Sequence, residues 1–227
     1  MKTKLILFDI DGTLLTSGGA GESALRLAVK DRFGRDDDLK DIEIAGRTDT
    51  AIARQIFARH AVEPTPENLG AFFDRYLHHL SAELRLGKGA LLPGILELLR
   101  ALRGRPHVAV ALLTGNLSRG AEIKLTHYGI WEYFDFGAYA DDHTDRNQLG
   151  KFARARALEK HGVEFLPADI FVLGDTPHDI DCGRAFGAKT VAIATGNYSR
   201  DQLASHNPDY LFENLKDVPR VLAMLGL

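Results

Sequence analysis

Residues 5–15 read LILFDIDGTLL, an apolar run that ends in two carboxylates and a glycine. The run from Leu5 to Phe8 is typical of a strand that is covered on both faces. Because Gly12 favours a turn, Asp9 and Asp11 are expected at the carboxyl edge of that strand, where open α/β sheets bind ligands. Two carboxylates this close repel each other unless a cation or a shared proton intervenes. An Asp-Gly turn alone explains Asp11 but not Asp9, so we interpret the pair as a site.

Two later apolar runs also end in polar residues. They are residues 108–113, followed by Thr114, Gly115 and Asn116, and residues 170–173, followed by Gly174, Asp175 and Asp179. The carboxyl ends of parallel strands meet at one edge of a sheet, so these side chains are expected to converge on one crevice. Strands and helices alternate from residue 108 onward, which predicts an α/β fold with a Rossmann-like, doubly wound parallel sheet.

The segment between the first two of these strands has helical periodicity and no clear strand. Helices are expected at about 22–33, at about 49–60 with Asp49 as the cap, and at 66–86. Glycine-rich joints at 18–19 and 87–89 flank the segment and indicate hinges. We therefore expect a small helical cap domain at 17–87, inserted into a discontinuous core domain of residues 1–16 and 88–227.

Further elements are expected after the cap. They are helices at about 93–103, 119–128 and 149–161, strands at 133–139, 190–194 and 210–212, and a short helix with a capping box formed by Ser199 and Gln202.

Composition narrows the class of protein. The chain has 227 residues, 45% of them hydrophobic, and a formal net charge of −3. It has no basic block for nucleic acid or a membrane surface, so a small molecule is the expected partner. Cys182 is the only cysteine, so no intrachain disulfide can form, and a reducing, cytoplasmic location is expected. We expect a monomer or a small homo-oligomer.

The three strand ends together resemble the signature of the haloacid dehalogenase-like hydrolase superfamily. Asp-x-Asp-Gly-Thr at 9–13 resembles the first sequence motif of this superfamily, Thr114 resembles its second, and Gly-Asp-x-x-x-Asp at 174–179 resembles its fourth. The core of this superfamily is often interrupted by a helical cap between the first and second motifs, which is where the helical segment lies here. The chain is most similar to the capped, phosphoglycolate phosphatase-like group.

The resemblance implies a Mg²⁺-dependent phosphatase that hydrolyses a small phosphorylated metabolite. Asp9 is then the nucleophile that forms an aspartyl-phosphate, and Asp11 is the general acid and base. Asp9, the backbone carbonyl of Asp11 and Asp175 would bind the metal, and Asp179 would do so directly or through water. Mg²⁺ prefers such oxygen ligands and would relieve the repulsion between Asp9 and a phosphate dianion.

The resemblance also implies groups that bind the phosphate. Thr114, the Gly115 amide and Asn116 would bind the phosphoryl oxygens that do not take part in bond making or breaking. The third motif requires a cationic residue, and Arg146 and Lys151 both qualify. We prefer Arg146, because it precedes the helix at 149–161 whereas Lys151 lies about one turn inside it. Many capped relatives have Lys-Pro-x-Pro at this motif, and this chain does not.

Three points stay open at this level. Arg47, at a loop-to-helix junction of the cap, is a candidate substrate-binding residue. Residues 141–143 could form a second metal site, although such polar loops are usually hydrated. The alternatives to a phosphatase are a phosphomutase on the same scaffold and a non-catalytic regulator or binding module. The intact acids argue against the regulator, and Asp11 argues against a true dehalogenase, whose chemistry does not need it.

Overall fold

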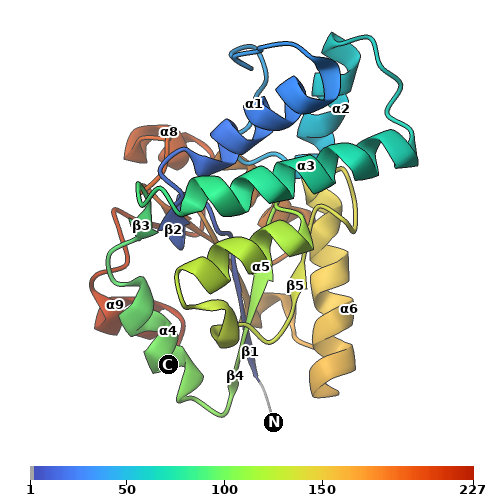
Figure 1. The fold of residues 1–227 in the computed structure, drawn as a ribbon. Helices are drawn as coiled ribbons and strands as arrows, with labels where there is room; N and C mark the ends of the chain where they lie inside the picture. Colours follow the sequence, from blue (N-terminus) through green and yellow to red (C-terminus); the bar gives the residue numbers. More distant parts are fainter. Residues whose placement is uncertain (1–2) are drawn as a thin grey trace.

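A six-stranded parallel sheet is the centre of the computed structural model, which describes residues 3–227 (Figure 1). Its strands are β1 (Lys4–Phe8), β4 (Val108–Leu113), β5 (Gly137–Ala138), β6 (Ile170–Gly174), β7 (Lys189–Ile193) and β8 (Tyr210–Phe212). Their order is β5-β4-β1-β6-β7-β8, so the chain starts in the middle and winds outward on both sides. This order confirms the predicted doubly wound α/β fold.

Helices cover both faces of the sheet. Side chains of β1 alternate between the faces, with Ile6 and Phe8 on one and Leu5 and Leu7 on the other. The first face packs against α4 (Ile95–Arg103), α5 (Ser118–His127) and α9 (Val218–Met224), and the second against α6 (Leu149–His161) and α7 (Pro177–Ala185). All four side chains are fully buried, and each contributes about 1.5–3 kcal/mol of transfer free energy. A continuous apolar run therefore forms the central strand.

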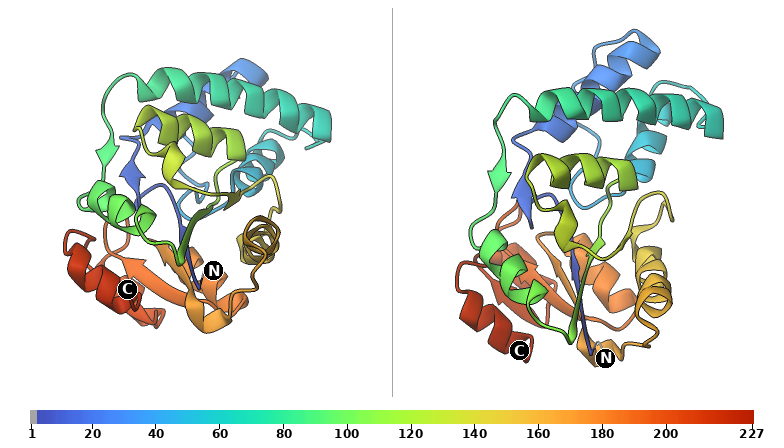
Figure 2. Two further views of the ribbon diagram at one scale, coloured as in Figure 1. Left: turned by 90° about the horizontal axis from the view of Figure 1, so that it is seen from below. Right: turned by 60° about the horizontal axis from the view of Figure 1, so that its bottom comes forward.

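Three further helices lie together beyond the carboxyl ends of the strands (Figures 1 and 2). They are α1 (Ala20–Phe33), α2 (Asp49–Arg59) and α3 (Pro66–Leu84). Their buried faces share an apolar cluster of their own, in which Phe57 packs edge-on against Phe72 at 5.6 Å between ring centroids. The cluster also includes Leu117 and Ala140 from the core, so these helices rest directly over the crevice edge of the sheet.

The connection between these helices and the core is a short ribbon that the sequence analysis did not predict. β2 (Leu15–Thr16) pairs antiparallel with β3 (Ala90–Leu91). A Cβ atom added at Gly18 would lie 2.4 Å from the backbone of Lys88, so the two glycine-rich joints run side by side. The division at residues 17–87 remains our prediction of the domain boundary.

Other differences from the predictions are local. The strand expected at 133–139 is limited to β5, and its first expected residue belongs to the 3-10 turn Trp131–Tyr133. The helix expected from Pro93 begins at Ile95, after Gly94 in a left-handed conformation. Helix α9 was not predicted, although Asp217 caps it. The capping box of Ser199 and Gln202 does begin α8 (Arg200–Ser205) as predicted.

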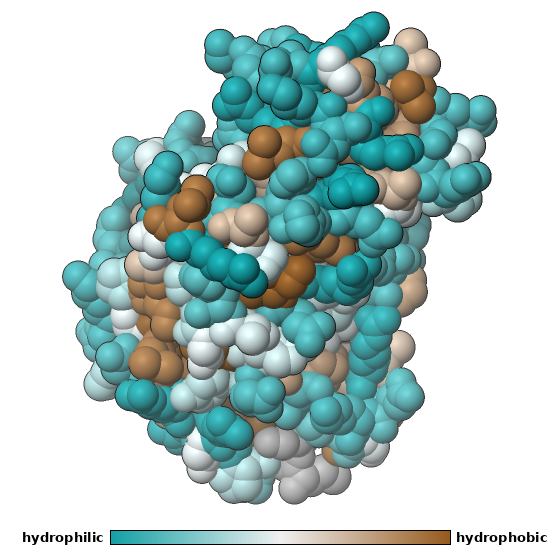
Figure 3. Space-filling model, in the orientation of Figure 1, coloured by the Kyte–Doolittle hydropathy of each residue, from teal (hydrophilic) through white to brown (hydrophobic). Residues whose placement is uncertain are grey.

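The surface is polar over most of the face shown in Figure 3, where apolar side chains form small separate groups. Among the described residues, no helix is both long and apolar enough to cross a membrane.

Candidate active site at the carboxyl edge of the sheet

Asp9 and Asp11 lie where β1 ends, as predicted. The Asp9 amide still donates to the Leu173 carbonyl at 2.9 Å, so this residue is held at the edge of the sheet next to β6. Gly12 then turns the chain with a φ of +81°, and a Cβ there would lie 2.3 Å from the Asp175 carboxylate. Only glycine therefore allows this turn to pass so close to the second strand end.

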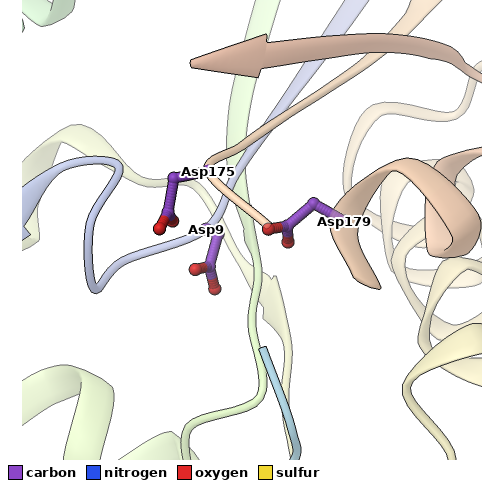
Figure 4. Close-up of side chains that lie close together, drawn as sticks. All are labelled: Asp9, Asp175 and Asp179. Carbon is purple, nitrogen blue, oxygen red and sulfur yellow. The ribbon is translucent and has the colours of Figure 1, made fainter. Parts of the chain in front are cut away.

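Three acids converge here: Asp9 directly after β1, Asp175 directly after β6, and Asp179 in the first turn of α7 (Figure 4). One carboxylate oxygen from each lies within 4.8 Å of the others, and all three side chains are buried. Asp175 accepts a hydrogen bond from the Thr13 hydroxyl at 3.0 Å. Asp179 accepts from the backbone amide and the hydroxyl of Thr176, at 3.0 and 2.7 Å, in the capping box that begins α7.

Burial and mutual repulsion perturb these acids. Burial raises the pKa of Asp9 to about 6, an effect that Arg146 opposes and that Asp179 and Asp11 increase. The pKa of Asp175 is raised well above its ordinary value, first by burial and then by Asp179 and Asp9. Negative charge is thus costly in this crevice unless a cation is close to it.

Arg146 is the cation that the structure places beside these acids. It lies in the 3-10 turn Arg146–Gln148 before α6, and its side chain is 8% exposed. One guanidinium nitrogen, Nη2, lies 3.1 Å from Asp9 Oδ1 and donates to Asp179, and Nη1 donates to the Gly46 carbonyl at 2.9 Å. Lys151 instead lies at the surface and donates to Gln148 at 2.6 Å. Of the two candidates, the structure therefore brings only Arg146 into the crevice.

Residues that follow β4 form the opposite wall. Thr114 is fully buried, and its hydroxyl lowers the pKa of Asp9 by hydrogen bonding. Asn116 donates through Nδ2 to the Thr114 hydroxyl at 2.9 Å and to Asp11 Oδ2 at 3.0 Å. Strand ends far apart in the sequence are thereby joined in one polar network.

A cap loop closes over this wall. A Cβ at Gly115 would lie 2.1 Å from the Arg47 carbonyl oxygen, so the absence of a side chain allows the loop to approach. The Arg47 guanidinium pairs with Glu43, whose Oε1 also lies 3.1 Å from His178 Nε2 in the core. Arg47 lines the cavity, but its charge is already paired.

The cavity between cap and core has a volume of about 360 Å³. Its lining includes Asp9, Asp11, Asn116 and Arg146 from the core, and Glu22, Ile44, Ile52 and Tyr76 from the helical segment. The crevice can hold a small molecule between the charged residues of the core and the polar and apolar residues of the helical segment.

Comparison with known proteins agrees with this geometry. Residues 6–184 match the model of the family described as haloacid dehalogenase-like hydrolase. The chain belongs to this family. The predicted family and the prediction that the chain is a hydrolase are thus confirmed.

Individual relatives of this haloacid dehalogenase-like hydrolase are distant but match over almost their whole length. It is 25% identical to the "Probable phosphatase IndB" of Dickeya dadantii, covering 94% of this chain and 91% of the relative. It is also 25% identical to a "Phosphoglycolate phosphatase" of Vibrio vulnificus, covering 93% and 92%. The solved structure of CbbY from Rhodobacter sphaeroides in complex with phosphate superposes with a TM-score of 0.76 at 22% identity, covering 99% and 100%. That likeness shows the fold.

Lys124 is a site residue that the sequence analysis missed. It lies on α5, and its ammonium contacts Asp11 and Asn116, each at 2.6 Å. The available signal was its spacing, because Lys124 falls between Ala121 and Leu125 on the side of the helix that faces the core. The polar segment 195–197 after β7 was also missed, although it ends a strand at the same edge and lines the cavity.

Asp49 does not have the predicted capping role. The Thr48 side chain caps α2 by accepting from the Ala51 amide at 3.1 Å. Asp49 is instead buried in the first turn and accepts from the Leu117 amide at 2.8 Å, which joins the cap to the start of α5. Burial raises its pKa to about 6. Its neighbours in space, which the sequence does not reveal, give it this role.

Two other polar features have no direct place in the site. Residues 141–143 are engaged locally, with Asp142 paired to Arg156 at 2.6 Å and Asp141 accepting from the Ser118 amide. Among the described residues, the only group of acids, cysteines and histidines close enough to hold a metal is the one at Asp9. Cys182 is buried, and burial raises the pKa of its thiol to about 12, which makes it unreactive.

Proposed function

We propose that this chain is a Mg²⁺-dependent phosphatase that hydrolyses small phosphomonoesters through an aspartyl-phosphate on Asp9. The observation that carries the proposal is the meeting of three buried carboxylates with a single guanidinium at the edge of a parallel sheet, in a family of hydrolases. The relatives named as phosphatases support the same reaction class.

The residues present fit a divalent cation. Asp9, Asp175 and Asp179, when ionised, leave two negative charges uncompensated by Arg146, and their oxygens are the hard ligands that Mg²⁺ prefers. Asp9, Asp175 and the backbone carbonyl of Asp11 would hold the ion. Both oxygens of Asp179 already accept hydrogen bonds, which favours its acting through water. A bound Mg²⁺ would offset the charge of the phosphate and polarise its oxygens.

The chain's own residues then have distinct roles. The Asp9 carboxylate attacks phosphorus, and the bond to the leaving oxygen breaks as Asp11 donates a proton to it. Asp11 next removes a proton from the water that attacks the aspartyl-phosphate, which releases inorganic phosphate and restores Asp9. Arg146 orients Asp9 and pairs with phosphoryl oxygens.

The remaining groups select and hold the substrate. The Thr114 hydroxyl, the Gly115 amide and Asn116 would bind the non-bridging oxygens of the phosphoryl group, at little cost in reorganisation. The helical segment 17–87 acts as a cap that excludes water. In this role the loop at Arg47 contacts the leaving group, and the cavity of about 360 Å³ limits its size.

A substrate screen tests this proposal. The purified protein is assayed against a panel of phosphorylated metabolites, including phosphoglycolate and sugar phosphates, by release of inorganic phosphate. We expect hydrolysis that EDTA abolishes and Mg²⁺ restores, and inhibition by Ca²⁺, which is larger and coordinated differently. Equal hydrolysis in EDTA would contradict the assigned acids, and no hydrolysis of any member would contradict the phosphatase.

A further inference from the structure

Lys124 is a buried cation in the cavity that the reaction above does not use. Its side chain is 4% exposed, and α1 covers it, since a Cβ added at Gly21 would lie 3.8 Å from Nζ. Burying an ammonium is costly unless the charge is paired and hydrogen-bonded. The partners of Lys124 are therefore informative about its role.

Lys124, Asp11 and Asn116 form a closed triangle of hydrogen bonds. Lys124 Nζ donates to Asp11 Oδ2 and to Asn116 Oδ1, both at 2.6 Å, and Asn116 Nδ2 donates to Asp11 Oδ2 at 3.0 Å. Asp11 Oδ2 thus accepts from two donors, while no described side chain donates to Oδ1. The Asp11 side chain is still 40% exposed, toward the cavity.

We infer that Lys124 is a positioning residue that holds Asp11 by Oδ2 so that Oδ1 faces the leaving group. This inference rests on the proposed function, in which Asp11 exchanges a proton with the leaving oxygen. A carboxylate at the end of a rotatable side chain loses efficiency when it is not aligned with the proton it transfers. Two donors on one oxygen restrict that rotation.

A purely structural role for Lys124 makes a different prediction. Helix α5 packs against α3 of the cap, so loss of the ammonium could simply loosen the interface between cap and core. Such loosening would affect all substrates alike. A positioning role affects the leaving groups that need a proton and spares those that do not.

The leaving-group comparison uses Lys124→Met, which keeps an unbranched apolar stem and removes the ammonium. The steps up to departure of the leaving group determine kcat/KM, so this parameter is compared for an alkyl phosphate and an aryl phosphate. We expect a loss of roughly tenfold or more on the alkyl phosphate and less than about threefold on the aryl phosphate. Lys151→Met is the matched control, because that lysine is exposed and outside the crevice.

A double-mutant cycle with Asp11→Asn tests whether Lys124 acts through Asp11. If it does, the double variant is no slower on the alkyl phosphate than Asp11→Asn alone. Multiplied losses, or equal losses on both phosphates, would overturn the inference, as would a Lys124→Met variant that behaves like Lys151→Met.

Folding and basal activity are controlled separately. Thermal unfolding of each variant is measured, and Lys124→Gln, which keeps an N–H donor, replaces Lys124→Met in the cycle if the latter does not fold. A wild-type chain that cleaves neither phosphate overturns the proposed function and this inference with it. Wild-type cleavage combined with any of the contrary outcomes above overturns the inference alone.

Discussion

Residues 36–38, in the loop between α1 and α2, and the buried cluster at the edge of the sheet are each a group of three aspartates, but the two groups differ in their charge balance. Each of these three loop acids has a basic partner: Lys30 lies 3.0 Å from Asp36, Arg59 lies 3.0 Å from Asp37, and Lys40 lies 2.9 Å from Asp38. Arg59 also lies 3.5 Å from Asp41 in the same loop. The hydrogen bond from Lys40 lowers the pKa of Asp38, as expected for an exposed, paired carboxylate.

At the edge of the sheet, two of the three buried acids, Asp9 and Asp179, share the guanidinium of Arg146, and Asp175 lies close to both. There the pKa of Asp9 rises to about 6 instead of falling. Acids that are adjacent in sequence on a loop can each find a partner, whether exposed as Asp36 and Asp38 are or largely covered as Asp37 is. Acids from different strands that are forced together in a buried crevice cannot, and this imbalance is what makes the crevice a candidate cation and phosphate site.

The largest expected effect is that of Asp9→Asn. The amide keeps the shape of the side chain but cannot attack phosphorus as an anion, so kcat should fall by roughly 10³-fold or more. Steady-state hydrolysis of the best substrate in the panel measures it, with circular dichroism to verify the fold. Asp36→Asn, the same change in the loop, is the control and should retain wild-type activity. A folded Asp9→Asn protein with full activity would refute the mechanism.

The next largest effect is expected at the shared guanidinium. Arg146→Ala removes the cation that orients Asp9, so kcat/KM should fall by about 10²-fold or more. Lys151→Ala should stay within a few-fold of wild type, because that side chain contacts only Gln148. The reverse ranking would transfer the role to Lys151, and two mild effects would move the search to Arg47.

The charge imbalance also predicts how stability depends on pH. The folded-state pKa of Asp9 is above its ordinary value of 3.8, so the folded protein binds this proton more tightly than the unfolded chain. The stability associated with that proton is present below pH 4 and is lost as the pH rises through about 6. In EDTA, wild type should therefore lose on the order of 1–3 kcal/mol relative to Asp9→Asn between pH 4 and pH 7.5.

Urea unfolding at several pH values measures this difference. Added Mg²⁺ should stabilise wild type more than Asp9→Asn at pH 7.5, because the ion binds the folded state. Parallel stability curves for the two proteins would show that Asp9 carries no such penalty.

The smallest effect is expected in the loop. Asp36 and Lys30 are exposed and screened by solvent, and surface pairs of this kind contribute little. Asp36→Asn should change the free energy of unfolding by less than about 0.5 kcal/mol, with no new response to Mg²⁺. A large gain in stability, measured by urea unfolding, would mean that the loop, too, stores uncompensated charge.

Local patterns were sufficient for most of the fold. The bounds of β4 and α6 agree with the predictions, because a continuous apolar run predicts a buried strand and a helical period predicts a helix. The ribbon of β2 and β3 was missed because each strand has only two residues, and short pairings depend on which segments meet in space. Asp49 was wrongly predicted to be the N-cap residue of α2, because Thr48 beside it is an equally good capping residue and the sequence does not distinguish the two.

The sequence by itself determined the strand ends and the polar residues that follow them, because the apolar runs before Asp9, Thr114 and Asp175 can be recognised in the sequence alone. Only the tertiary structure showed that Arg146, and not Lys151, lies beside Asp9 and that Lys124 reaches Asp11. The physical reason is that a lysine or arginine has the same local pattern whether its charge is solvated or buried. Which acid it pairs with depends on how helices dock on the sheet, and that docking is set by apolar packing far from the charges themselves.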